Sequence, residues 1–295
     1  MPLKKEPLRP PRQSDVAAVH FASVPPPRPP GPPFLVTKEH RRFVEFADAV
    51  RRNRYIGVCY GPPGIGKTLS ARTYSAADAW DDWFNDRYLK DSTVPDGIVQ
   101  ARTAMWTPRV TTTPRELDQA VPARCQQVSF AIEAHLNPDY DPLVYGANRG
   151  CAYTELLIVD EADRLKTGGL EQLRDFFDRH QLGVILIGMP GLEKRLARYP
   201  QLYSRVGFAH QYRPLSADEL AFVLQRHWSQ IGQSIDADDF TDTEAIAAVA
   251  RITGGNFRLI ERLFGQVQRV LEINQLRTIT REVVEAARDT LVIGA

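Results

Sequence analysis

Eight consecutive residues, GPPGIGKT at positions 61–68, constrain this chain more strongly than any other stretch of its sequence. They match the pattern G-x-x-x-x-G-K-[ST] at every fixed position and directly follow the apolar run IGVCY at 56–60. Between a strand and a helix, such glycines let backbone N–H groups point at a phosphate, and the lysine reaches the β- and γ-phosphates. An ordinary glycine and proline turn is the alternative, but strand, loop and helix all fall where the phosphate-binding motif requires them.

The same motif predicts a nucleotide and a metal ion. The hydroxyl of Thr68 is placed to ligate Mg²⁺, and a helix that begins near Lys67 turns its positive dipole end toward the phosphates. We therefore expect ATP and Mg²⁺ as cofactors. The residues of this loop predicted to bind ATP are Gly61, Pro62, Pro63, Gly64, Ile65, Gly66, Lys67, Thr68 and Leu69.

A second motif, LLIVDE at 156–161, supplies the acids that this chemistry needs. Its four apolar residues predict a buried strand, and successive strand side chains point in opposite directions. We assign Asp160 to the metal, together with Thr68, and Glu161 to the catalytic role of general base or water positioning. A strand that merely ends in exposed acids is the alternative. Residues 160–163 also spell DEAD, the signature of a helicase class, but the chain lacks the later arginine-rich motif and is too short for two RecA-like lobes.

Composition limits the remaining possibilities. The 295 residues can bury one large core or two modest ones, and a formal net charge of +1 excludes a globally basic nucleic-acid coat while leaving room for a local basic surface. Cys59, Cys125 and Cys151 show no metal-ligand spacing and favour a reducing cytoplasm, and Cys59 is expected to be a small core residue. No apolar run approaches membrane-spanning length, so we expect no membrane contact.

Residues 1–36 contain half of the chain's 22 prolines and more basic than acidic side chains. This composition predicts an extended, disordered basic tail, which serves either as a plain linker or as a docking segment. Thr37 follows as an N-cap, and Phe43, Phe46 and Val50 recur at helical spacing. The folded part is therefore expected to begin at residue 37.

Strands and helices alternate from residue 37 to residue 213. After the phosphate-loop helix, the acidic stretch at 78–96 is interpreted as a solvated loop with aromatic anchors, and 98–106 as a second strand. Thr113 and Glu116 form a capping box that predicts a helix start, and a helix near 170–180 leads to another buried strand at 183–187. This alternation predicts an α/β core with a parallel sheet and a ligand at the carboxyl ends of its strands.

Past Arg213 the pattern is helical only. Capping boxes at 216–219 and 241–244 predict two helix starts, and Gly254 and Gly255 end the second helix. Further helices are expected at about 256–274 and 280–291. Residues 214–295 therefore predict a small, all-helical C-terminal domain.

Together these motifs resemble the AAA+ ATPases. Besides the phosphate loop and the strand that ends in Asp160 and Glu161, the chain carries an arginine in LYSR at 202–205 and another in GNFR at 255–258. Within that class, the runs PQLYSRVGFAHQYRPLSADEL and TGGNFRLIERL are similar to the ATPases of transposition systems, the MuB, TniB and TnsC type, and to the secretion ATPase ExeA. The resemblance covers about residues 37–291 and implies a P-loop core followed by a helical lid domain.

The resemblance also implies roles for the two arginines. Arg205 would be the catalytic arginine finger that reaches the γ-phosphate of a neighbouring subunit, and Arg258 a lid residue that touches ATP in its own subunit. Each has an alternative, a surface charge for Arg205 and helix capping for Arg258. The strand at 184–187 ends in GMP at 188–190, where AAA+ proteins usually carry a polar sensor residue. This departure favours slow hydrolysis that depends on DNA and on assembly.

A basic stretch near the second strand resembles the element that lines a DNA channel in initiator-like AAA+ proteins, and we expect it to lie between that strand and its helix. Arginine and threonine are typical phosphate partners, which position a duplex without reading its sequence. A solvated loop and helix start is the alternative for each of them. The residues predicted to bind DNA are Arg102, Arg109, Thr111 and Arg115.

The sequence as a whole favours an ATP-dependent, oligomeric regulator of transposition. We expect it to assemble on double-stranded DNA as a ring or helical filament and to deliver or license a transposase at a target site, with a target-selector protein as a further partner. A secretion or assembly ATPase of the ExeA kind is the main alternative, and the chain shows neither a membrane segment nor a peptidoglycan-binding module. A regulatory nucleotide-binding scaffold with negligible turnover is a third reading, and Glu161 argues against it.

Overall fold

The computed structural model describes residues 34–86, 93–137, 150–230, 232–236 and 238–291. Residues 35–295 belong to one compact unit, and most of the expected basic tail, residues 1–33, lies outside the described residues. The strands are β1 (Ile56–Tyr60), β2 (Thr103–Trp106), β3 (Leu156–Val159), β4 (Gly183–Gly188) and β5 (Val206–Gln211). The helices before residue 213 are α1 (Lys38–Asn53), α2 (Lys67–Tyr74), α3 (Ala77–Asp86), α4 (Asp96–Ala101), α5 (Pro114–Leu136), the 3-10 turn η1 (Ala162–Arg164), α7 (Thr167–His180), α8 (Leu192–Leu196) and α9 (Pro200–Tyr203). The helices after residue 213 are α10 (Ala217–Gln230), α11 (Phe240–Thr253), α12 (Phe257–Asn274) and α13 (Arg281–Asp289).

The sheet explains why the predicted site residues meet. Its strand order is β2-β3-β4-β1-β5, and every neighbouring pair is parallel. The register pairs Tyr60 at the end of β1 with Gly188 at the end of β4, and Val159 at the end of β3 with Leu186. The carboxyl ends of β1, β3 and β4 therefore lie at one edge, where a parallel sheet usually binds its ligand. The predicted α/β core with a parallel sheet is confirmed.

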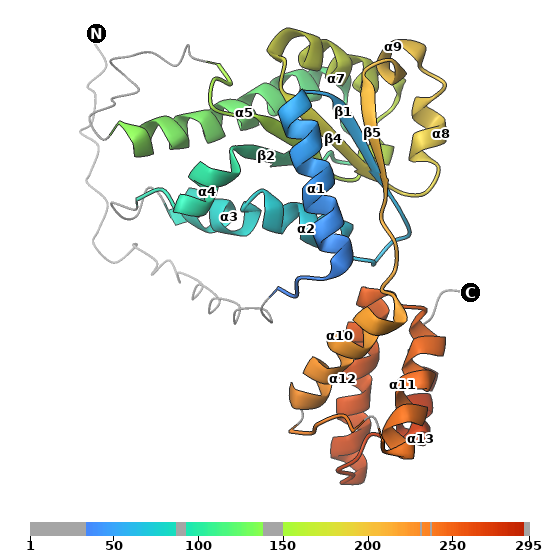
Figure 1. Cartoon of the computed structure of the whole chain (residues 1–295). Coiled ribbons are helices and arrows are strands. Elements are labelled where there is room, and N and C mark those ends of the chain that lie inside the picture. Colours follow the sequence, from blue (N-terminus) through green and yellow to red (C-terminus); the bar gives the residue numbers. More distant parts are fainter. Residues whose placement is uncertain (1–33, 87–92, 138–149, 231, 237, 292–295) are drawn as a thin grey trace, which may run out of the picture. The chain divides into compact units, whose positions relative to one another are not determined.

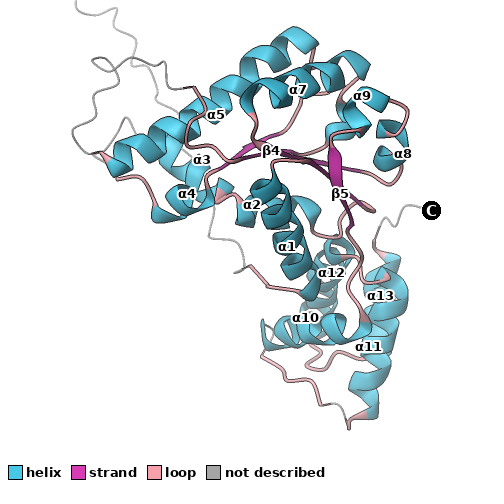
Figure 2. Ribbon diagram, turned by 45° about the horizontal axis from the view of Figure 1, so that its top comes forward, coloured by secondary structure: helices cyan, strands magenta, loops and turns pink. Residues whose placement is uncertain are grey.

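Helices cover both faces of this sheet (Figure 2). On one face, Phe43 and Val50 of α1, which lies in front of the sheet in Figure 1, pack in one apolar cluster with Cys59 of β1. The expected core position of Cys59 is thus confirmed. On the other face, residues of α5 and α7 pack in a second cluster that includes Val58. Adjacent strand residues belong to different clusters because side chains alternate across a strand.

The first part of the acidic stretch at 78–96 is a helix, so its interpretation as a solvated loop is wrong. α3 forms there because Trp80, Trp83 and Phe84 recur at the spacing of one helical face and pack against the core. Trp80 stacks on Phe84, with the ring centroids 5.4 Å apart. The acids lie on the remaining faces of a helix that these aromatic side chains hold in place.

The second strand is shorter than predicted. Residues 98–101 belong to α4, and β2 begins only at Thr103. Arg102 between them adopts a left-handed backbone conformation with φ of 45° and ends the helix. The stretch predicted as one strand is thus divided into a helix and a shorter strand by one residue with a left-handed backbone.

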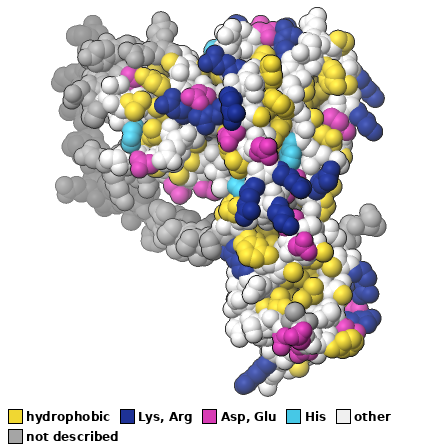
Figure 3. Space-filling model, in the orientation of Figure 1, with side chains coloured by type: hydrophobic (Ala, Val, Ile, Leu, Met, Phe, Trp, Pro, Cys, Tyr) yellow, Lys and Arg dark blue, Asp and Glu magenta, His cyan; other side chains and the backbone are white. Residues whose placement is uncertain are grey.

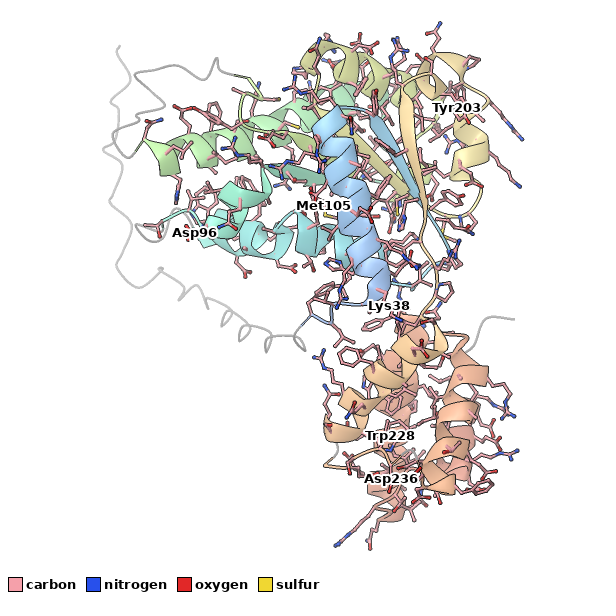
Figure 4. All side chains as sticks on the ribbon, in the orientation of Figure 1. Lys38, Asp96, Met105, Tyr203, Trp228 and Asp236 are labelled. Carbon is pink, nitrogen blue, oxygen red and sulfur yellow. The ribbon has the colours of Figure 1, made fainter. Side chains whose placement is uncertain are left out.

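The helices after residue 213 enclose an apolar core of their own. Trp228, labelled in Figure 4, is fully buried there, and its indole N–H donates to Asp242 Oδ1 over 3.4 Å. The other oxygen of Asp242 accepts the backbone N–H of Asp236 over 2.8 Å. Burying a side chain as large as Trp228 contributes about 1.5–3 kcal/mol or more. The predicted helical C-terminal part is confirmed.

One helix start in this part differs from its prediction. The capping box expected at 241–244 is wrong, because α11 begins at Phe240 and its N-cap is Asp239. The Asp239 carboxylate accepts the backbone N–H of Thr241 over 2.8 Å. Aspartate and threonine are both good N-cap residues. Asp239 takes this position rather than Thr241 because its side chain reaches the first free N–H groups of the helix.

The surface carries charges of both signs. On the face shown in Figure 3, Lys and Arg side chains lie among Asp and Glu side chains. Among the described helices, none combines the length and the apolar character that crossing a membrane requires.

Candidate nucleotide-binding site

The phosphate loop has the backbone geometry that its sequence predicts. β1 ends at Tyr60, and α2 begins at Lys67 with Gly66 as its N-cap. Gly64 and Gly66 have φ of 78° and 107°, a region that side chains other than glycine rarely enter. The first free N–H groups of α2 therefore face the loop, where an anion would also meet the positive end of the helix dipole.

Lys67 is buried and folded onto its own loop. Its Nζ donates to the carbonyl oxygens of Gly61 and Pro62, each over 2.6 Å. Burial lowers the pKa of Lys67, although nearby anionic groups, including Asp160 and Asp163, act in the opposite direction. Phosphate oxygens are stronger acceptors than neutral carbonyls for such a cation, so the lysine is placed to exchange these partners for a phosphate.

Asp160 and Thr68, the two residues predicted to bind the metal, lie in contact with each other. Asp160 is buried at the end of β3, and its Oδ1 accepts the backbone N–H of Glu161 over 2.9 Å. Burial raises the pKa of Asp160, while a hydrogen bond from the hydroxyl of Thr68 works against that rise. A carboxylate and a hydroxyl that already touch each other are the oxygen ligands that Mg²⁺ takes in phosphate sites, and both fit that ion here.

Glu161 lies beside this pair but is engaged elsewhere. Its backbone is left-handed, with φ of 51°, which ends the strand and turns the chain into η1. Its carboxylate forms an ion pair with Arg164, three residues later. Asp160 and Glu161 both follow the last residue of β3, so the strand alternation from which their different directions were predicted does not apply to them.

Asp163 is a site residue that the sequence reasoning missed. Its Oδ1 accepts the backbone N–H of Met189 over 2.9 Å, at the end of β4. A Cβ on Gly188 would collide with this oxygen, so the glycine makes room for the carboxylate. The polar side chain that β4 itself lacks is thus supplied by η1. The fourth letter of DEAD, combined with the missing polar residue after β4, was the available signal.

The helical C-terminal part, which we expect to be a lid domain and call the lid, contacts the phosphate loop directly. The backbone N–H of Arg258 donates to the carbonyl oxygen of Gly64 over 2.9 Å, and the amide of Asn256 donates to that of Pro63 over 2.8 Å. Asn256 also caps α12, because its side chain accepts the N–H of Leu259. One asparagine therefore starts the lid helix and joins it to the loop.

These elements enclose a cavity of about 560 Å³, large enough for a nucleotide. Arg258 lines it as predicted, whereas Gly61, Pro62 and Ile65 do not, and Ile65 is buried in the apolar cluster beneath α1. The lining residues are Pro63, Gly64, Gly66, Lys67, Thr68, Leu69, Arg72, Asp160, Glu161, Asp163, Gly188, Met189, Phe257, Arg258 and Glu261.

Comparisons with known proteins indicate the family of this chain. Residues 50–196 match the family described as "AAA domain". A Staphylococcus aureus protein named "Potential ATP-binding protein" is 44% identical over 265 residues, which cover 88% of this chain and 97% of that protein. The chain belongs to the AAA family of ATP-binding proteins.

Solved structures share the AAA fold with this chain. The Thermotoga maritima RuvB Holliday junction branch migration motor matches with a TM-score of 0.54 at 17% identity, covering 88% of this chain and 70% of that one. Aeropyrum pernix ORC1 in complex with DNA matches with a TM-score of 0.52 at 18% identity, covering 88% and 66%. At these identities the likeness shows the fold, and the predicted AAA+ architecture is confirmed. The transposition branch stays a prediction.

In this AAA chain, Arg205 lies apart from the residues that line the nucleotide cavity. It sits between α9, whose last residue Tyr203 is labelled in Figure 4, and β5. Its Nε and Nη2 donate to the two oxygens of Asp178 over 2.5 and 2.8 Å. The side chain is 30% exposed, so solvent or a second subunit can reach it.

The predicted DNA-binding residues of the AAA core do not form one group. Arg102 precedes β2 and pairs with Glu155 over 3.2 Å, whereas Arg109 and Thr111 follow β2 and are exposed. The prediction that Arg102 lies between the second strand and its helix is wrong, because the strand starts after it. A strand of this length separates its ends by roughly 10 Å or more. Arg115, exposed in the first turn of α5, remains on the side of Arg109.

The contact between lid and loop yields a prediction. Asn256→Ala removes both the helix cap and the link to Pro63, and Asn256→Ser keeps a capping oxygen but is too short for the link. We expect the alanine variant to lose about 1 kcal/mol of unfolding free energy and the serine variant only a few tenths. Both should bind ATP about fivefold more weakly, the worth of one hydrogen bond. Urea unfolding and calorimetric titration measure the two effects, and a serine variant with wild-type ATP affinity would contradict the proposed link.

Proposed function

We propose that this protein is an ATP-hydrolysing switch of the AAA family. The observation that carries the proposal is the convergence of Lys67, Asp160 and Glu161 with the lid residue Arg258 on one cavity. Lys67 of the core and Arg258 of the lid would both offset the negative charge of the phosphates. Bound ATP therefore favours one arrangement of lid and core, and loss of ATP favours another.

Hydrolysis would use the acids at the ends of β3 and in η1. Water attacks the γ-phosphorus, the bond to the oxygen that bridges the β- and γ-phosphates breaks, and ADP and inorganic phosphate are released. Glu161 accepts the proton of the attacking water after it leaves Arg164. Thr68 and Asp160 would hold Mg²⁺, which neutralises charge that develops on the phosphates. Asp163 would orient the water from the side of β4.

Assembly would complete this site. Arg205 lies outside the cavity of its own subunit, and its partly exposed position suits a contact with the γ-phosphate in a second copy of the chain. An arginine supplied by a neighbour makes turnover depend on the number of subunits that meet. We therefore infer a homo-oligomer, either a ring or a helical filament, in which the rate of ATP hydrolysis depends on assembly.

Double-stranded DNA is the partner that we propose for the loop after β2. Arg109 and Thr111 are exposed in that loop, and Arg115 follows in the first turn of α5. RuvB is described as a Holliday junction motor and ORC1 was solved with DNA, and we infer the same class of ligand for this chain. The motif similarity to transposition ATPases then favours a cytoplasmic regulator that licenses a transposase at its target, with a target-selector protein as a further partner. If an integrase-like reading frame lies beside the gene, the protein that it encodes is the first partner to test. Co-purification of the two proteins on DNA in the presence of ATP would measure their interaction.

The two ends of β2 offer a matched test of DNA binding. Arg109→Ala and Arg115→Ala should each lower the slope of log K against log salt by about one, because one phosphate contact is lost. Arg102→Ala, at the opposite end of β2, should leave the slope unchanged. Fluorescence anisotropy with a labelled duplex and ATP measures these slopes.

The basic tail is the rival source of affinity. If a chain without residues 1–36 loses all DNA binding, and Arg109→Ala and Arg115→Ala both keep the wild-type slope, then the loop after β2 is not the DNA-binding element. If Arg102→Ala alone lowers the slope, the duplex lies at the other end of the strand.

A further inference from the structure

Two of the three cysteines touch each other, although one lies in α5 and the other precedes β3. Cys125 is buried in the apolar cluster between α5 and the sheet, and the half-buried Cys151 packs against the same cluster. A hydrogen bond joins the two side chains. Neither cysteine is among the described residues that line the nucleotide cavity. The pair is therefore a second group of reactive side chains, apart from the phosphate chemistry.

Hydrogen bonds fasten the turn that carries Cys151 to one face of α5. The hydroxyl of Thr154 donates to the carbonyl oxygen of Cys125 over 2.7 Å, and the backbone N–H of Thr154 donates to Ser129 Oγ over 3.1 Å. Cys125 and Ser129 share this face because they lie one helical turn apart. The N–H of Thr154 also donates to the carbonyl of Cys151 over 3.1 Å. The backbone on both sides thus holds the two thiols in contact, so a disulfide between them needs little movement.

The contact makes the two thiols unequal. The hydrogen bond from the S–H of Cys125 lowers the pKa of Cys151, although burial acts in the opposite direction. The same hydrogen bond, together with burial, raises the pKa of Cys125. The thiolate is the nucleophile in thiol–disulfide exchange, so Cys151 is the attacking group and Cys125 the second thiol. Burial also raises the pKa of Cys59, which lies in a different apolar cluster and is expected to stay inert.

Cys151 also lines a cavity at the opposite edge of the sheet from the phosphate loop. The cavity measures about 910 Å³, and residues that line it precede β1, β3 and β4. Its size lies within the range of pockets that bind small molecules. The basic residues that line it are Arg51, Arg52, Arg54, Arg179 and His180, and the acidic ones are Asp48 and Glu155. Arginine is therefore the most frequent charged side chain around Cys151.

The two acids of this cavity already have partners, whereas two of its arginines do not. Glu155 pairs with Arg51 over 2.6 Å, and Asp48 accepts the hydroxyl of Tyr74 over 2.7 Å. Arg52 and Arg54 are exposed, and neither forms an ion pair with any of the described residues. Guanidinium groups bind carboxylates through paired hydrogen bonds, so these two arginines suit a ligand that carries carboxylates.

We propose that Cys151 and Cys125 form a thiol–disulfide exchange site for a small disulfide that carries carboxylates. The Cys151 thiolate attacks one sulfur of the ligand, a mixed disulfide forms, and the disulfide bond of the ligand breaks to release one thiolate. The sulfur of Cys125 then attacks the sulfur of Cys151, the proton of Cys125 passes to the second half of the ligand, and that half leaves as a thiol. Two protein thiols are thereby oxidised to one disulfide, and one ligand disulfide is reduced to two thiols.

The product ties α5 covalently to the segment before β3. Formation of the mixed disulfide removes the thiolate whose hydrogen bond raises the pKa of Cys125, so the second step becomes easier once the first is complete. The exchange goes beyond the proposed function, because it requires neither ATP nor DNA.

The test treats the reduced full chain with oxidised glutathione, and intact mass and peptide mapping are the readouts. The wild-type chain should lose the mass of two hydrogen atoms and yield one peptide pair linked through Cys125 and Cys151. Cys125→Ser should gain one glutathionyl group at Cys151, because no second thiol resolves the mixed disulfide. Cys151→Ser should stay unmodified, and Cys59 should stay a free thiol throughout.

A probe of opposite charge tests the role of the arginines. Cystamine is a small disulfide with two amino groups and no carboxylate. Replacement of Arg52 and Arg54 together by alanine should lower the rate with oxidised glutathione about tenfold, through loss of electrostatic attraction, and should not lower the rate with cystamine. Arg198→Ala removes an exposed arginine that does not line this cavity and should keep both rates.

Each result decides for or against the exchange site. A wild-type chain that stays reduced, or that keeps glutathione on Cys151 without forming the internal disulfide, overturns the proposal. So does an unchanged rate with oxidised glutathione in the double arginine variant, because the ligand then needs no carboxylates. If circular dichroism shows that Cys125→Ser does not fold, Cys125→Ala replaces it, and the peptide map of the wild-type chain still decides whether the two sulfur atoms join.

Discussion

Lys67→Ala is expected to bind ATP at least about a hundredfold more weakly than the wild-type chain, because two or more charge-assisted bonds to phosphate disappear with the ammonium group. The lysine is the buried cation of the loop, and its present acceptors are the neutral carbonyls of Gly61 and Pro62. Removing a cation whose pKa burial already lowers should cost the fold little. Calorimetric titration with Mg²⁺ and ATP measures the affinity, and thermal unfolding checks that the fold persists.

Glu161→Gln is the matched control for this effect. The amide keeps the size of the side chain and loses only the ability to accept a proton, so ATP should bind with wild-type affinity while turnover falls by about a hundredfold or more. A variant that binds ATP but does not hydrolyse it also accumulates in the ATP-bound state. If Lys67→Ala bound ATP as tightly as Glu161→Gln, the assignment of the phosphate loop would be refuted.

The local parts of the site could be predicted from the sequence because their chemistry fixes their geometry. A phosphate loop needs glycine at positive φ, and Gly64 and Gly66 have that conformation. A buried strand that ends in acids needs only a short apolar run, so Asp160 was placed correctly at the end of β3. These signals span a few residues and do not depend on the rest of the fold.

The parts that failed depend on contacts between distant segments. Asp163 reaches the site through the N–H of Met189, 26 positions later, so its recognition required combining the fourth letter of DEAD with the missing polar residue after β4. Arg102 was grouped with Arg109 by proximity in sequence, although a strand lies between them. β5 was not recognised because its residues alternate between half-buried and exposed at the edge of the sheet, which gives a weak apolar signal.

The acidic helix α3 failed for a different reason. Aspartate has low helix propensity, and a run of such residues around aromatic side chains looked like a loop. Packing of Trp80, Trp83 and Phe84 against the core outweighs that propensity. The aromatic spacing was visible in the sequence, and the periodicity carried more information than the composition.

Arg205→Ala is expected to bind ATP normally and to hydrolyse it about a thousandfold more slowly if the side chain completes a neighbour's site, because arginine fingers carry effects of this size. The variant also removes the hydrogen bonds to Asp178, which lower the pKa of that carboxyl group in the folded chain. Arg174→Ala is the matched control, since Arg174 pairs with the same carboxylate over 2.8 Å but is not proposed to reach a phosphate. It should keep wild-type turnover.

Mixing two inactive variants then tests whether the arginine acts across an interface. Lys67→Ala subunits lack a working nucleotide site but keep Arg205, and Arg205→Ala subunits keep the site but lack the arginine. At an interface where the first kind contributes its arginine to the second kind, one complete site forms, and up to about a quarter of the wild-type turnover should return in an equal mixture with random assembly. Cross-linking before the assay verifies that mixed oligomers form. Wild-type turnover by Arg205→Ala alone, or verified mixed oligomers without any recovery, would rule out the finger and leave Arg205 as the partner of Asp178 within one subunit.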